Sequence, residues 1–380
     1  MRTLVLGDLH LSTHAPRGAS ADLALLLEAH RGARVVFAGD FFDLSAEVGA
    51  SHSRSVAAGF AAHPRVTQAL AEHVEHDGEI VWLSGNHDCE IGEDASVITR
   101  ALGLSPAAAA RVKTTPWFYR QGALHVEHGH LYDPDNAPPH PLASARGTLG
   151  VHFVEEFIAK TGAFAYLNAN DDTPLRLLVS AFRWYGARAP HVVYRYFRAA
   201  FAALGKSGRF YNGARDAARA EEGLLRFLAS SGLDEPTARA LMSECATPTM
   251  ASMQATVARL YLDRVAATVA LLAGMSALLL GKRRLALALG AAGLGGLAWS
   301  WSQGHDRYGG KVSERLDDAA RRVAQASGAS LVVFGHAHEI ADREGYSNTA
   351  SFAFPRGGRK RPYLEIEGSP DHPRAVRRWI

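Results

Sequence analysis

Short apolar runs alternate with stretches of helical periodicity in the first third of the chain. Three runs are continuous and rich in β-branched or aromatic side chains, as in strands covered on both faces: residues 3–6, 34–38 and 79–83. Residues 21–30 and 55–76, which lie between them, have the spacing of helices. The resulting βαβαβ order predicts an α/β sheet, and a further strand is expected at 123–127.

The pattern changes after Pro134, where residues 135–141 contain three prolines. Residues from about 144 to 327 have an almost wholly helical pattern. Strand-like segments then return at 331–334, 346–354, 363–366 and 374–380. We therefore predict one α/β domain in two parts, residues 1–137 and 328–380, with an all-helical insertion at 138–327.

The composition excludes some classes of protein and does not indicate a function. The 380 residues carry a net charge of only +3, which is too weak a bias to indicate a nucleic-acid-binding protein. Two cysteines, Cys89 and Cys245, do not make a disulfide framework or a cysteine zinc site. Because a strand and the first motif occupy residues 2–10, no room is left for a signal peptide, and we expect the catalytic part to stay in the cytoplasm.

Five short motifs combine glycine with Asp, Asn or His, and four of them begin at the end of an apolar strand. They are Gly7-Asp8-Leu9-His10, Gly39-Asp40-Phe41-Phe42-Asp43, Gly85-Asn86-His87-Asp88, His128-Gly129-His130 and Gly335-His336-Ala337-His338. Ligands of open α/β sheets gather beyond the carboxyl ends of strands, so these motifs are expected to converge. Oxygen and imidazole donors suit Mn, Fe, Zn or Co rather than Ca. The glycines are expected where the backbone turns sharply before a ligand.

As a set, the motifs resemble those of the calcineurin-like metallophosphoesterase superfamily: D-x-H, G-D-x-x-D, G-N-H-D/E, H and G-H-x-H, in that order. The resemblance covers roughly residues 1–134 and 328–380. It includes a late strand at 346–352, in which Ala350 replaces the usual glycine. It implies a layered β-sandwich flanked by helices.

The resemblance also implies two divalent metal ions, with Mn the first choice. One ion would be held by Asp8, His10 and His338, the other by Asn86, His128 and His336, and Asp40 would bridge them. A hydroxide between the ions would attack phosphorus in line. His87 would act near the leaving group as a proton donor or transition-state stabiliser, and Asp88 would orient His87.

Other residues have plainer interpretations. A single Asp after a strand is usually a turn or cap residue, and only the joint occurrence of the motifs favours a metal site. Asp43 and His130 are expected to support the ligands rather than to bind metal. His125 is expected to be packed, and six histidines are expected to face solvent or to lie on a helix surface: His14, His30, His52, His63, His73 and His76.

Two uncharged runs within the insertion, residues 265–281 and 285–304, flank Lys282-Arg283-Arg284. Each run can just cross a hydrocarbon core, and the second contains Trp299 and Trp301, which favour membrane interfaces. This hairpin, residues 265–304, is interpreted as membrane-attached. The alternative is a buried helix pair or an oligomer contact. A basic loop on the far side of the membrane would oppose the positive-inside tendency, so an embedded or interfacial hairpin, with the basic side chains reaching the head groups, is the expected compromise.

Residues 182–198 interleave aromatic and Arg side chains, as in a helix on anionic lipid or in an ordinary cap helix. A lid between the His-Gly motif and the last motif is similar to that of the UDP-2,3-diacylglucosamine hydrolase branch. That branch, however, usually has Arg in place of His87 and a shorter lid.

We therefore expect hydrolysis of a lipid-linked phosphoester or pyrophosphate at the cytoplasmic side of the inner membrane, without nucleic acid. The alternatives are a soluble phosphodiesterase or nucleotide hydrolase, or a catalytically silent membrane-bound interaction protein. The sequence does not indicate an oligomeric state.

Overall fold

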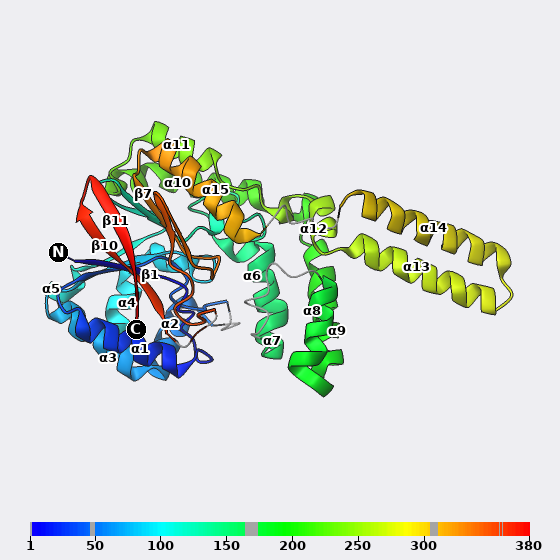
Figure 1. Cartoon of the computed structure of the whole chain (residues 1–380), viewed down its shortest axis with the longest axis horizontal. Coiled ribbons are helices and arrows are strands. Elements are labelled where there is room, and N and C mark those ends of the chain that lie inside the picture. Colours follow the sequence, from blue (N-terminus) through cyan, green and yellow to red (C-terminus); the bar gives the residue numbers. More distant parts are fainter. Residues whose placement is uncertain (1, 46–49, 164–173, 305–310, 357, 359) are drawn as a thin grey trace. The chain divides into compact units, whose positions relative to one another are not determined.

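A computed structural model describes residues 2–45, 50–163, 174–304, 311–356, 358 and 360–380. It contains a six-stranded sheet and a five-stranded sheet (Figure 1). The first has the order β11 (His372–Trp379), β10 (Pro362–Ser369), β1 (Thr3–Leu6), β2 (Arg34–Phe37), β3 (Glu79–Leu83) and β4 (Val112–Thr115). Strands β1 to β4 are parallel, and β10 and β11 extend the sheet in antiparallel fashion.

The second sheet joins the two distant parts of the chain. Its order is β5 (Phe118–Gln121), β6 (Leu124–Glu127), β7 (Leu331–Phe334), β9 (Tyr346–Asn348) and β8 (Ala341–Arg343). Strand β6 pairs in parallel with β7, so the segments before and after the insertion become neighbours. The predicted strand at 346–354 is confirmed only over its first three residues. Strands β4, β5 and β8, which are short and largely polar, were not predicted.

Apolar side chains separate the layers because successive residues of a strand face opposite sides. Val5 and Val36 of the first sheet belong to the same buried cluster as Val126 and Val333 of the second. On the other face of the first sheet, a second cluster lies under α1 (Arg17–Ala29), α2 (His52–Ala62), α3 (Pro64–Glu75) and α4 (Ala95–Leu102). A third contains side chains of the second sheet together with those of α10 (Gly213–Ser231), α11 (Glu235–Ser243) and α15 (Val312–Ser327). The predicted β-sandwich flanked by helices is confirmed.

The predicted helix at 55–76 is two helices, α2 and α3, because Pro64 cannot donate a backbone hydrogen bond and begins a new helix after His63. His63 is buried, with Nε2 donating to the Ser12 carbonyl at 2.9 Å. His73 is buried as well, and its Nε2 donates to a backbone carbonyl at 3.0 Å. The prediction that these two histidines face solvent is wrong, whereas the packed position of His125 is confirmed.

The described part of 138–327 contains helices, turns and loops and no strand. It divides between two compact units. The sheet unit comprises residues 1–164, 212–248 and 312–380, and the helical unit comprises 165–211 and 249–311. The division into compact units does not test the predicted boundaries of the insertion at residues 137 and 327, because part of an insertion can pack within the sheet unit. These boundaries remain a prediction.

The helical unit contains α8 (Pro174–Tyr185), α9 (Ala189–Leu204), α12 (Met253–Arg259), α13 (Leu262–Leu279) and α14 (Arg283–Ser302). Helices α13 and α14 form an antiparallel hairpin (Figure 1). Both are long and apolar enough to cross a membrane by length and composition, and only 22% and 17% of their most apolar windows are buried.

Candidate metal centre

The chemical motifs lie where strands end. Asp8 follows β1, Asp40 follows β2 and Asn86 follows β3 in the first sheet, while His128 follows β6 and His336 follows β7 in the second. Both sheets therefore direct polar side chains to one edge of the sandwich, as the strand-end argument requires.

Two groups of buried donors form there. In one, His338 Nε2 lies 3.0 Å from Asp8 Oδ1 and 3.3 Å from His10 Nε2. In the other, His128 Nε2 lies 3.1 Å from Asp40 Oδ2 and 3.1 Å from Asn86 Oδ1. Asp8, Asp40 and His128 offer ligand atoms that all lie within 4.8 Å of one another, so the two groups adjoin.

These spacings test whether a cation fits. Donors bound at about 2.1 Å to one cation, at tetrahedral or octahedral angles, stand about 3.0 to 3.4 Å apart. The His338 nitrogen has that separation from the Asp8 oxygen and from the His10 nitrogen. Two imidazole nitrogens facing each other at 3.3 Å have at most one proton between them when neutral, and a cation satisfies both. The residues present fit a divalent metal.

His336 lies near these donors but contacts them through its ring edge and its backbone. Its ring is 5.2 Å from that of His128, and its backbone N–H donates to Asp8 Oδ2 at 3.2 Å. Its Nε2, however, bonds Asp133 Oδ2 at 3.0 Å, so only Nδ1 could bind a cation, and His336 belongs to none of the donor groups found among the described residues. The carboxylate fixes the orientation of the ring, as outer partners of metal-binding histidines do.

Five of the predicted ligands have a left-handed backbone: Asp8, His10, Asp40, His336 and His338, with φ between 48° and 64°. This conformation costs about 1–2 kcal/mol for an ordinary residue, and less for Asp. Such strain, repeated at one edge of a sandwich, is typical of functional sites. It turns each side chain out of the strand direction and toward the common centre.

The glycines before the ligands are needed for two reasons. At Gly39, φ is +85°, and a Cβ atom would lie 2.6 Å from the His128 ring. Gly85 has no left-handed φ, and there a Cβ would overlap the Asp40 carboxylate. The expectation of a sharp turn therefore holds at Gly39, whereas Gly85 is required by the close approach of Asp40.

Burial and opposite charges compete in the cluster. Burial alone would raise the pKa of Asp40, but His128 and His87 outweigh it and hold that pKa well below its usual range. Burial would lower the pKa of His128, but Asp40 raises it to about 9. Burial and the neighbouring His87 lower the pKa of His10 to about 4. Asp40 is therefore ionised and His10 is neutral, the states in which they bind metal, whereas His128 would have to release its proton when an ion binds.

Comparison with known families agrees with this arrangement. The family model of the calcineurin-like phosphoesterases matches residues 1–194, which include four of the five motifs. The chain belongs to this family. No curated protein matches the chain. The fifth motif, at 335–338, lies beyond the matched residues, and the pairing of β7 with β6 carries it to the same edge.

Family membership and the donor cluster together support a metal-dependent phosphoesterase that uses divalent ions. The resemblance drawn from the motifs is thus confirmed at the level of the superfamily. The placement within the UDP-2,3-diacylglucosamine hydrolase branch, the identity of the metal and the metal-binding or catalytic role of each residue remain predictions.

In this phosphoesterase, His87 is oriented by Asp43 rather than by Asp88. The His87 ring has its Nδ1 2.9 Å from Asp43 Oδ1 and 3.0 Å from Ser45 Oγ. Burial opposes protonation of His87, but Asp40 and Asp43 raise its pKa to about 9. The ring thus donates Nδ1–H to Asp43 and turns Nε2 toward Asp40, whose Oδ2 lies 4.0 Å away.

Asp88 binds backbone groups rather than the His87 ring. Its carboxylate accepts hydrogen bonds from the backbone N–H groups of Asp40, Phe42 and Gly85, at 3.1, 3.1 and 2.8 Å. It therefore ties the loop after β2 to the loop after β3. Among the hydrogen bonds of the described residues, none joins Asp88 to His87, which corrects the expected orienting role.

Asp133 and Asn136 were missed by the sequence analysis. Asp133 contacts His336 as described and accepts from Asn136 Nδ2 at 2.7 Å, while Asn136 Oδ1 accepts from Asn86 Nδ2 at 3.2 Å. They link two predicted ligands through one short loop. The available signal was the polar segment Asp133-Pro134-Asp135-Asn136, which was interpreted only as the start of a break.

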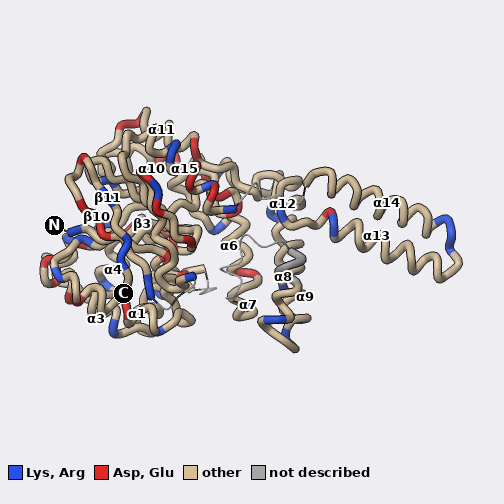
Figure 2. The backbone as a smooth tube through the Cα atoms, in the orientation of Figure 1, with Lys and Arg blue, Asp and Glu red and all other residues tan. Residues whose placement is uncertain are grey.

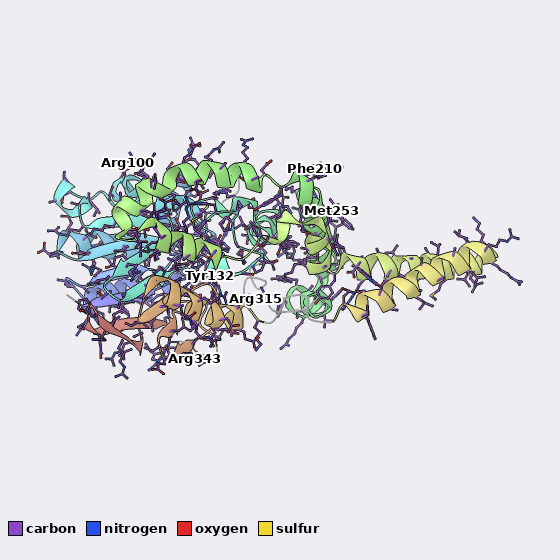
Figure 3. The ribbon with its side chains drawn as sticks, turned by 90° about the horizontal axis from the view of Figure 1, so that it is seen from above. Arg100, Tyr132, Phe210, Met253, Arg315 and Arg343 are labelled. Carbon is purple, nitrogen blue, oxygen red and sulfur yellow. The ribbon has the colours of Figure 1, made fainter. Side chains whose placement is uncertain are left out.

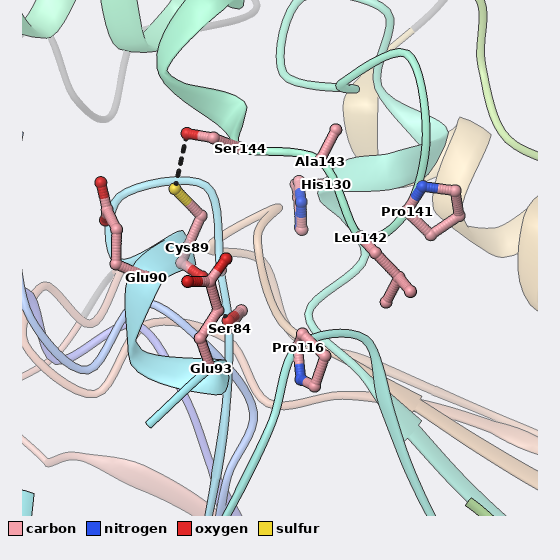
Figure 4. Close-up of a pocket in the computed structure, with 11 residues that line it drawn as sticks. Ser84, Cys89, Glu90, Glu93, Pro116, His130, Pro141, Leu142, Ala143 and Ser144 are labelled. Carbon is pink, nitrogen blue, oxygen red and sulfur yellow. Dashed lines mark hydrogen bonds between the residues drawn. The ribbon is translucent and has the colours of Figure 1, made fainter. Parts of the chain in front are cut away.

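A pocket adjoins the donors within the sheet unit (Figure 4). It is partly open to solvent and is lined by Ser84, Gly85, Cys89, Glu90, Glu93, Pro116, His130, Pro141, Leu142, Ala143 and Ser144. His130 faces this space, and its ring lies 5.3 Å from that of His128. Burial and the neighbouring His128 lower the pKa of His130 well below its usual value, so its ring is neutral.

Proposed function

We propose that this protein hydrolyses a phosphoester or pyrophosphate bond in a lipid-linked substrate at the cytoplasmic surface of the inner membrane, using two divalent ions, with Mn as the first choice. The observation that carries the hydrolytic part is the convergence of buried Asp, Asn and His donors from both sheets. The soluble substrates of the alternative function would need the same donors but not the apolar hairpin.

The donor groups divide into two sites. Asp8, His10 and His338 would hold one ion, and Asn86, His128 and His336 the other. Asp40 would lie between them, because it belongs both to a group with His10 and to a group with Asp8 and His128. When bound, such ions supply a hydroxide at neutral pH and neutralise charge on the phosphoryl oxygens.

His87 would serve the leaving group. Its Nδ1 is held by Asp43, so the Nε2–H is the one available for donation. Against burial, Asp40 and Asp43 raise the pKa of His87 to about 9, and Asp43, which binds no ion in this proposal, would still favour the protonated ring when Asp40 binds the ions. Donation to the departing oxygen would avoid the release of an unprotonated alkoxide.

The lipid part of the proposal is supported by the hairpin α13–α14, which exposes large apolar side chains along its length. A catalytic chain attached to a bilayer meets membrane-embedded substrates at high local concentration. The pocket beside His130 adjoins the donors, on the side where a group attached to the phosphate would lie.

The test uses the full chain in detergent micelles with Mn²⁺ and pairs of substrates that share one phosphate headgroup, one member with acyl chains and one without. We expect kcat/KM to be at least tenfold higher for the acylated member. Equal values would refute the lipid part and leave the hydrolase intact. Asp40→Ala should abolish turnover of both members, while Asp77→Ala, at an exposed surface carboxylate, serves as control. Full turnover by Asp40→Ala would refute the metal-site assignment.

A further inference from the structure

The hairpin α13–α14 exposes large apolar side chains and buries mainly small residues, whereas a water-soluble helix pair buries its large apolar side chains. Apart from Leu262 at the base, the buried residues of the two helices are small: Ala267, Gly274, Ala277, Ala286, Gly293 and Ser300. A Cβ atom at Gly293 would lie 2.6 Å from Leu271 Cγ and 2.8 Å from the Ala267 carbonyl, so the backbones touch closely. Side chains stand out from both helices (Figure 3). Among the large apolar ones, Leu272, Met275, Leu279, Leu287 and Leu294 are each more than half exposed. Close contact of small residues with apolar surfaces outside is the packing of helices in lipid.

Charged residues lie at the two ends of the hairpin, and none lies along the helices between these ends (Figure 2). At the base, Arg264 donates to Ser300 Oγ at 3.0 Å and to the Gly304 carbonyl at 2.9 Å, and its guanidinium lies 4.8 Å from the Tyr261 ring. At the tip are Lys282, Arg283 and Arg284. The 17 uncharged residues between Arg264 and Lys282 span about 26 Å as a helix. That length matches a hydrocarbon core with basic side chains reaching the headgroups at either end.

Charge is divided unequally between the two compact units. The helical unit has 14 Lys and Arg against 4 Asp and Glu, a net charge of +10. The sheet unit has 27 against 34, a net charge of −7. The overall charge of +3 conceals this separation, and the helical unit is complementary to an acidic lipid surface.

The distribution of basic residues along the chain removes the objection that a basic tip raises. Within 20 residues of the base, the chain has seven Lys and Arg: Arg259, Arg264, Arg307, Lys311, Arg315, Arg321 and Arg322. The tip has three. Orientation follows the difference between the two sides, so the larger number keeps the base in the cytoplasm while the tip crosses.

Helices α8 and α9 add a second lipid-facing surface at the base side. Residues 174–211 contain seven Lys and Arg and no Asp or Glu. On α9, exposed residues recur at helical spacing: His191, Tyr194, Arg198 and Phe201. On α8, Val179, Phe182 and Arg183 are exposed in the same way. Both helices run across the direction of the hairpin (Figure 1), as helices lying along a membrane surface would.

We infer that α13–α14 crosses the bilayer completely, with its tip at the far surface, and that α8 and α9 lie on acidic phospholipid headgroups of the cytoplasmic leaflet. This deepens the membrane part of the proposed function and is independent of hydrolysis.

The first test locates the tip. Cys89 and Cys245 are replaced by Ser, and a single cysteine is introduced at the tip by Lys282→Cys or at the base by Gln303→Cys. An impermeant maleimide is added to spheroplasts that express the full chain. We expect labelling of the tip variant in intact spheroplasts and of the base variant only after permeabilisation. Protection of the tip until permeabilisation, or labelling of the base in intact spheroplasts, would overturn the crossing. The same labelling pattern in a chain that also carries Asp40→Ala would show that the topology does not depend on catalysis.

The second test addresses α8 and α9. The full chain with Phe201→Cys, in the same background, is labelled with an environment-sensitive dye and reconstituted in phosphatidylcholine vesicles with or without phosphatidylglycerol. We expect a blue shift with the acidic lipid that is lost in 1 M salt and reduced by Arg198→Glu, but retained in Arg65→Glu on the sheet unit. Identical emission in both vesicle types would overturn the headgroup contact.

Discussion

Substitution of Gly39 by Ala isolates the geometry of the metal centre without removing a ligand. The new Cβ would lie 2.6 Å from three atoms of the His128 side chain, where ordinary contacts begin at 3.4 Å. The imidazole must therefore move away by about 0.8 Å. Metal–ligand distances tolerate a change of only about 0.2 Å, so His128 would no longer be in position to bind. The hydrogen bond from His128 Nδ1 to the Ala38 carbonyl, 2.9 Å long, holds the ring against such a shift.

From this displacement we expect a 10- to 100-fold loss of metal affinity and about a 100-fold loss of kcat/KM at fixed Mn²⁺. The left-handed φ of +85° adds a folding cost of about 1 kcal/mol for Ala. Mn²⁺ titration by calorimetry and by activity measures the first effect, and urea unfolding in EDTA measures the second.

Gly32→Ala is the matched control. Gly32 has a φ of +72°, and a Cβ there would meet nothing within 4 Å, so the backbone cost is similar and the clash is absent. We expect Gly32→Ala to lose a similar folding free energy while it binds Mn²⁺ like the parent. If Gly39→Ala bound metal and turned over substrate as well as Gly32→Ala, the proposed contact between glycine and ligand would be refuted.

Three further predictions concern the surroundings of the ligands and the fold. Asp43→Asn should lower kcat at least tenfold with metal content unchanged, because His87 loses its anionic partner; loss of metal instead would place Asp43 among the ligands. Asp133→Asn should weaken one of two Mn²⁺ binding steps 10- to 100-fold by loosening His336, and unchanged binding isotherms would contradict that role. Burial lowers the pKa of His73, so protons bind the unfolded chain more readily and the free energy of unfolding should fall as pH drops below about 6.5. In EDTA, His73→Gln should show a smaller fall than the parent between pH 7.5 and 5.5, and an equal fall would refute the assignment.

The strands and the ligand motifs could be predicted because their signals are local. Val35, Val36 and Phe37 form a continuous apolar run, and each glycine-containing motif stands directly after such a run. Residues 112–121 carry no such signal, because β4 and β5 are stabilised by pairing with neighbours rather than by their own side chains.

The roles of polar residues near the centre depended on contacts that sequence does not show. Asp43 and Asp88 are equally plausible partners of His87 by spacing alone. Only the fold turns Asp88 toward backbone N–H groups and brings Asp43 to the ring. His63 and His73 were misplaced for the same reason, since a helical pattern broken at Pro64 was interpreted as one continuous surface helix.

The donor set is assembled from the two extremes of the chain. Asp8 and His338 lie 330 positions apart, and α13 and α14 lie between them. During translation the hairpin is therefore complete before the last donors exist. If the hairpin enters the bilayer as it is synthesised, no nascent chain has a full catalytic centre before it has been delivered to the membrane, and activity in the free cytosol is avoided by the order of synthesis alone.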